Sequence, residues 1–157
     1  MSLERAVDAA RRLRDALASE VAAAREERLL LKRLDSTALF ARATARAHFL
    51  AEVARLEREM ALGLSAAASA FGLREVTLER LEQAAPEGGR RLAAALDEVR
   101  ALAGALREID RLNASLAQRA LACVRGYVDA LAPAPSAYGR AGARAAAPVL
   151  LTVSSRG

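Results

Sequence analysis

The chain has 157 residues, of which 41 are alanine, and its formal net charge is +5. Only 3% of the residues are aromatic, and tryptophan is absent. Alanine is the best helix former, whereas strands favour aromatic and β-branched residues. The composition therefore predicts an all-α fold. The length of the chain is sufficient for one ordinary domain. The single cysteine excludes an intramolecular disulfide.

The positive charge does not form the basic patch that nucleic acid would require. Residues 132–157 hold three arginines and no acid, which leaves 21 basic and 19 acidic side chains in residues 1–131. Nucleic-acid-binding domains usually gather their basic residues on one face. Three tail arginines would give only a weak, salt-dependent contact, so we expect no nucleic-acid partner.

The sequence shows no pattern of a membrane-spanning or secretory segment. No window of about 18 residues is both apolar and uncharged, so we expect no membrane insertion. The N-terminus becomes amphipathic at once and lacks the apolar core of a signal peptide. A cytoplasmic location is therefore expected.

Two long helices are predicted in the first half of the chain. Apolar residues at spacings of three and four run from Leu3 to about Arg33, which is the pattern of one helical face. An Asp-Ser-Thr stretch at 35–37 interrupts it, and these residue types cap helices. A second helix is then expected to reach about Phe71, because Gly72 is the residue type that commonly follows a helix end.

The second half is expected to hold a short helix capped by Thr77 and then the longest helix, from about Glu87 to Leu131. Pro86 suits the first turn of that helix, while the glycines at 88 and 89 are expected to make its start loose. Its apolar residues recur every seven positions, with a second set three positions later, and form a stripe that must be buried. The stripe consists of Leu92, Ala95, Val99, Leu102, Leu106, Ile109, Asn113, Leu116, Ala120, Cys123, Tyr127 and Ala130, widened by Leu96, Val124 and Leu131.

Three long helices and a short linker helix predict an antiparallel helical bundle or a long helical hairpin. We expect residues 1–131 to form this domain and residues 132–157 to form a mostly irregular tail. At 1.5 Å per residue, the first helix is about 46 Å long and the last about 67 Å. The first helix cannot cover the last from end to end, so part of the stripe is left for a partner or for self-association. Continuity of the last helix through Gly104 and Gly126 is left open.

The sequence holds no constellation for catalysis, for a metal ion or for a cofactor. His48 is the only histidine, and its neighbours four residues away, Thr44 and Glu52, do not suggest a metal cluster. Cys123 lies on the apolar stripe with no activating base in reach along the helix, so we expect it in the core. The chain is therefore predicted not to be an enzyme.

Asn113 is the one polar residue in the register of the stripe. Two interpretations are open. A buried amide of this kind can fix register or partner choice in a helical assembly, or it can simply bond a neighbouring helix or water within a core.

These features together resemble the FlgN-type flagellar export chaperones over essentially the whole chain. The first two helices join at Leu34-Asp-Ser-Thr-Ala-Leu39, and a Tyr138-Gly pair follows the last helix. Within that helix the family commonly carries an Asn-x-x-Asn-x-x-Leu-like signature, which Asn113 and Leu116 match, while Asp110 stands where the first Asn is often found. The segment Val149-Leu-Leu-Thr-Val153 has no counterpart that we can match to the family.

The resemblance implies a cytoplasmic chaperone for the hook–filament junction proteins FlgK and FlgL. Such chaperones bind the C-terminal helical segment of a subunit, prevent its early assembly and bring it to the export gate, whose platform protein is FlhA. The family's C-terminal tyrosine contacts that platform, and Tyr138 is the matching residue.

We expect substrate capture by helix-in-groove recognition on the last helix, with Asn113 setting the register. The alternative, from a different class, is a structural coiled-coil protein that self-associates through the same stripe. A monomer or weak homo-oligomer that binds a junction-protein peptide would favour the chaperone. The residues expected to line the groove are Leu106, Ile109, Asn113, Leu116, Val124 and Leu131.

Overall fold

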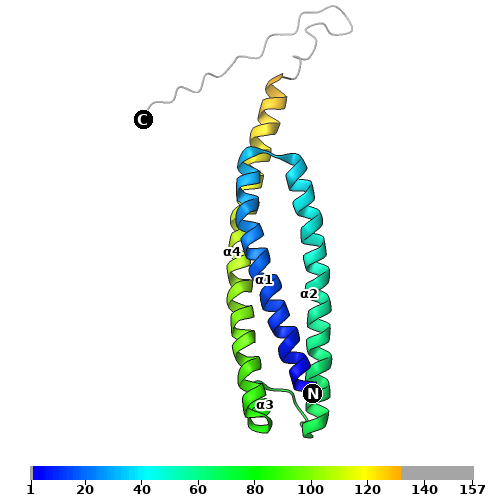
Figure 1. Cartoon of the computed structure of the whole chain (residues 1–157). Helices are drawn as coiled ribbons and strands as arrows, with labels where there is room; N and C mark the ends of the chain where they lie inside the picture. Colours follow the sequence, from blue (N-terminus) through cyan, green and yellow to red (C-terminus); the bar gives the residue numbers. More distant parts are fainter. Residues whose placement is uncertain (1, 132–157) are drawn as a thin grey trace, which may run out of the picture. The chain divides into compact units, whose positions relative to one another are not determined.

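The computed structural model describes residues 2–131, and within this range it contains four α-helices and no strand. They are α1 (Ser2–Arg33), α2 (Ser36–Phe71), α3 (Leu78–Ala84) and α4 (Pro86–Leu131) (Figure 1). The predicted all-α architecture is thus confirmed. By its internal contacts the chain divides into two units, residues 1–120 and residues 121–157, which we describe separately.

The helix ends form through the capping residues that the sequence predicted. The Oδ1 atom of Asp35 accepts a hydrogen bond from the Ala38 backbone N–H at 3.0 Å, which satisfies a free donor at the start of α2. Gly72 ends α2 with a φ of 65°, the left-handed conformation that glycine adopts without strain. Thr77 caps α3, because its Oγ1 accepts from the Arg80 backbone N–H at 3.3 Å.

Helix α1 is the central element of residues 1–120. α2 runs antiparallel to it, since Arg12 pairs with Glu59 and Glu20 with Arg42 (Figure 1). The part of α4 before residue 121 runs parallel to it. The side chains that α1 buries face both neighbours and form most of the core: Leu3, Ala6, Val7, Ala9, Ala10, Leu13, Leu17, Glu20, Val21 and Ala24.

The core has two apolar clusters along α1. One surrounds the N-terminal half of α1, where Val7 and Leu92 are fully buried together with Leu81 of α3. The other lies farther along and joins Leu17 of α1 to Leu56 of α2 and Leu106 of α4. Each cluster therefore contains side chains from α1, α2 and α4, and burying them is what holds the three long helices together.

The start of α4 is tight, so the expectation of a loose start at Gly88 and Gly89 is wrong. Both glycines are buried within the helix. A Cβ atom at Gly88 would lie 2.7 Å from Leu3 Cδ2, and one at Gly89 would lie 2.6 Å from the Glu82 Cα atom. These glycines permit close packing. At Gly104 and Gly126, by contrast, a Cβ would meet nothing within 4 Å, and α4 continues through both.

Three polar contacts show which residues of α1 and α4 lie side by side. The paired residues are 84 to 89 positions apart in sequence: Glu4 with Arg91, Arg14 with Glu98, and the Ala24 carbonyl with Asn113. The same offset places Arg33, the last residue of α1, level with about residue 119 of α4.

Candidate functional site

The last eleven residues of α4 carry a row of exposed large apolar side chains. Leu121, Val124, Val128 and Leu131 are 50%, 43%, 58% and 66% exposed. Spacings of three and four place them on one side of the helix, which we call the apolar face of α4. Every residue from 121 to 131 is exposed. This face has the chemistry of a surface that binds an apolar partner.

The residues predicted to line the groove fall into two groups. Leu106 is 7% exposed and packs in the second core cluster, against which Ile109 is also packed. Leu116 is partly buried, while Val124 and Leu131 are exposed. Contacts with α1 and α2 leave no open groove at Leu106, whereas the apolar face of α4 is open. Tyr138 lies outside the described residues.

Asn113 joins α4 to α1. Its side chain is buried, at 4% exposure, and its Nδ2 atom donates to the Ala24 backbone carbonyl at 2.7 Å. Its Oδ1 accepts from Arg28 Nε at 3.4 Å. Both polar ends of the amide are thus bonded by α1, the neighbouring-helix arrangement that one of the two interpretations described. The two bonds join α4 to α1 at one level along the helices.

Next to Asn113 lies an ionic layer that the sequence interpretation missed. Glu20 is 5% exposed, accepts from Arg42 Nη1 at 3.2 Å and lies 3.2 Å from Arg46 Nη1. Arg46 also donates to Asp110 Oδ1 at 2.8 Å, and this hydrogen bond raises the pKa of the Arg46 guanidinium. Arg42 Nε lies 3.2 Å from Glu27. We call these residues, with Asn113, the polar layer.

The polar layer marks one end of the buried apolar core. Among the described residues, no apolar side chain is buried in α1 after Ala24, in α2 before Leu56 or in α4 after Leu106. A signal for the layer was present in the sequence, because Glu20 interrupts the apolar positions of α1 between Leu17 and Val21. Buried charges of this kind are costly unless paired, so an acid at such a position indicates arginine partners.

Two other sequence predictions concern single reactive residues. Cys123 is exposed, so its predicted place in the core is wrong. The reason is that the seven-residue apolar repeat continues into residues 121–131, where every side chain is exposed. His48 is exposed on α2. Within residues 2–131, His, Cys, Asp and Glu side chains nowhere gather in threes as a metal site would need.

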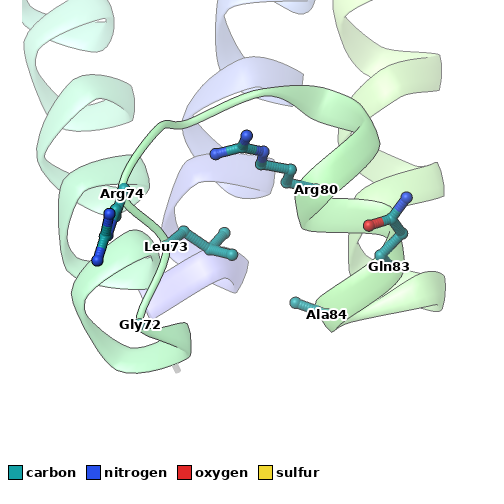
Figure 2. Close-up of a pocket in the computed structure, with 6 residues that line it drawn as sticks. All are labelled: Gly72, Leu73, Arg74, Arg80, Gln83 and Ala84. Atoms are coloured by element: carbon teal, nitrogen blue, oxygen red, sulfur yellow. The ribbon is translucent and has the colours of Figure 1, made fainter.

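A surface hollow of about 510 Å³ lies where α2 meets α3. Figure 2 shows Arg80 reaching from α3 toward the connecting loop and Leu73 beside it. The Nη1 atom of Arg80 also lies 3.4 Å from Glu75 Oε2. The lining contains no acid and no nucleophile, so the hollow offers no acid–base or covalent chemistry. Its lining residues are Gly72, Leu73, Arg74, Arg80, Gln83 and Ala84.

Comparison with known protein families identifies a match over most of the chain. A family model described as FlgN protein matches residues 1–146, which includes all four helices and Tyr138 but ends before Val149. No curated protein and no solved structure matched the chain. None of the four helices combines the length and apolarity needed to cross a membrane. The match extends over far more than half of the sequence, and the chain therefore belongs to the FlgN family of flagellar export chaperones.

Proposed function

We propose that this chaperone acts in the cytoplasm on the hook-associated junction proteins FlgK and FlgL. It binds their C-terminal helical segments, prevents premature assembly and delivers them to the export-gate protein FlhA. The observation that carries the proposal is the apolar face of α4, with Leu121, Val124, Val128 and Leu131 exposed on one side of the helix.

The chemistry of this face suits a helical substrate. An amphipathic helix could lay its apolar side against the row of Leu and Val side chains, the mode known as helix-in-groove recognition. Burying apolar area contributes roughly 25 cal/mol per Å². A substrate segment that orders only on binding loses part of this gain. Moderate affinity results, which a chaperone that must release its cargo requires.

The two groups of predicted groove residues receive different roles in this proposal. Val124 and Leu131 contact the substrate, together with Leu121 and Val128, which the sequence interpretation did not select. Leu106, Ile109 and Asn113 hold the part of α4 before residue 121 against α1. Leu116 lies between the groups. We further propose that residues 1–131 form the chaperone domain and residues 132–157 a docking arm.

The substrate face can be tested with a Val124→Glu/Leu131→Glu variant. Two carboxylates on the face should weaken binding of a peptide with the C-terminal helix of FlgK by about 100-fold or more, since about 1.4 kcal/mol corresponds to each factor of ten. Isothermal titration calorimetry measures the affinity. The matched control is Leu62→Glu on α2, because Leu62 is 67% exposed and Leu131 is 66% exposed. Undiminished binding by a double variant with unchanged helical circular dichroism would place the substrate site elsewhere.

Tyr138 is proposed to contact FlhA, a separate step from substrate capture. Tyrosine offers a large contact area with few rotatable bonds. Tyr138→Ala should weaken pull-down of the FlhA cytoplasmic domain while peptide affinity stays unchanged. An equal loss of both would argue against a separate role.

Self-association through the apolar face of α4 is the competing function, because the same exposed side chains would serve it. Sedimentation velocity separates the two. A monomer or weak dimer that forms a defined complex with the FlgK peptide supports the chaperone. A tight oligomer that ignores the peptide supports a structural coiled coil.

A further inference from the structure

The C-terminal tail contains one segment whose chemistry matches the apolar face of α4. All the large aliphatic residues of 132–157 lie in Val149-Leu-Leu-Thr-Val153, which we call the tail run, and this run carries no charge. It begins after residue 146, where the FlgN match ends. The run therefore lies outside the region that the family model matches.

The geometry of the chain allows the tail run to return to α4. The apolar face from Leu121 to Leu131 is about 15 Å long at 1.5 Å per residue. Five residues in extended form span about 17 Å at most, and the 17 residues from 132 to 148 reach up to about 60 Å. The run has a length close to that of the face, and the intervening chain is long enough for it to return from Leu131.

We propose that the tail run docks on the apolar face of α4 within the same molecule and occludes it until a substrate helix displaces it. The inference rests on the proposed function, because it assigns a regulatory partner to the same face. Tethering favours the tail run as occupant, since a segment joined by a short linker competes at an effective concentration on the order of millimolar.

A second copy of the chain is a weaker occupant of this face. Four side chains that are 43–66% exposed offer a few hundred Å² at most, whereas each partner in a stable interface buries about 800 Å². The small face suits a contact that is weak in itself and sustained by its tether.

Cys123 provides the probe for docking, because it is the only cysteine, is exposed and lies beside Val124. A nitroxide label on Cys123 of the full chain should broaden the amide NMR signals of residues 149–153. Leu150→Asp/Leu151→Asp should remove the broadening, whereas the matched Ser154→Asp/Ser155→Asp should retain it. Absence of broadening in the unsubstituted chain overturns the proposal. Broadening that arises only between a labelled and an unlabelled copy also overturns it, in favour of self-association.

A second measurement tests occlusion and separates it from the proposed function. Leu150→Asp/Leu151→Asp should bind the FlgK peptide about three- to tenfold more tightly than the unsubstituted chain, as expected when an internal competitor is lost. Equal affinities overturn occlusion. If neither protein binds the peptide while the nitroxide effect is present, the proposed substrate is wrong and the docking of the tail run is upheld.

Discussion

The two ends of α4 have the same apolar repeat but different surroundings. Between Pro86 and Asn113 the helix buries Leu92, Ala95 and Leu106 against α1 and its neighbours. From residue 121 to residue 131 every residue is exposed. The seven-residue repeat therefore identifies an apolar face of the helix, but it does not show whether another helix packs against that face. Coverage depends on where α1 ends and on where the polar layer interrupts the core.

The largest expected effect comes from shortening one leucine at each end of α4. Leu92 is fully buried, so Leu92→Ala should lower the free energy of unfolding by about 2–5 kcal/mol through lost burial and a cavity. Leu131 is 66% exposed, and Leu131→Ala should change stability by less than about 0.5 kcal/mol. Urea denaturation measures both. Similar losses from the two variants would mean that the end of α4 is packed in solution.

The polar layer should respond almost as strongly as the apolar core. Glu20→Gln removes the negative charge between two arginines whose side chains are 11% and 27% exposed. Removing one partner of a buried pair costs about 3–5 kcal/mol, and Glu27 next to Arg42 should reduce the loss toward the lower value.

The matched control is Glu98→Gln, since Glu98 also pairs with an arginine but its side chain is 56% exposed. Exposed pairs contribute little, so this variant should unfold near the unsubstituted midpoint in urea. Equal effects at Glu20 and Glu98 would remove the distinction between a buried layer and a surface pair.

Features that depend on residues close together in sequence could be predicted, whereas features that depend on residues far apart could not. Helix ends depend on neighbours, so Asp35, Gly72 and Thr77 could be identified as caps. The polar layer joins residues 22 and 64 positions apart, and the sequence alone does not say which arginines meet Glu20 and Asp110. For the same reason the prediction that Cys123 lies in the core was wrong. The seven-residue repeat continues into residues 121–131, and the sequence does not show that these residues are exposed.

Replacing two glycines by alanine should change the stability in opposite directions, which tests where the helices pack closely. A Cβ at Gly63 of α2 would lie 2.8 Å from the Ala6 backbone nitrogen of α1, so Gly63→Ala should destabilise by about 1–3 kcal/mol through overpacking. At Gly104 of α4 the same atom meets nothing within 4 Å, and Gly104→Ala should stabilise by about 0.5–1 kcal/mol by favouring the helix. Urea midpoints report the sign directly. A loss at both positions would mean that α4 has a close neighbour at Gly104.

The smallest expected effect is a loss of stability at low pH that comes from two carboxylates in residues 1–120. A hydrogen bond from Arg55 lowers the pKa of Glu52, and one from Arg111 lowers the pKa of Glu108, both from an ordinary value of 4.5. Because the folded-state pKa values are lower, folding favours the ionised carboxylates. Their contribution is complete above pH 4.5 and is lost as the pH falls through the lowered values. A Glu52→Gln/Glu108→Gln variant should therefore show a slightly shallower fall of Tm below pH 4.5 than the unsubstituted chain. Parallel Tm profiles would show that these two carboxylates have the same pKa in the folded and unfolded states.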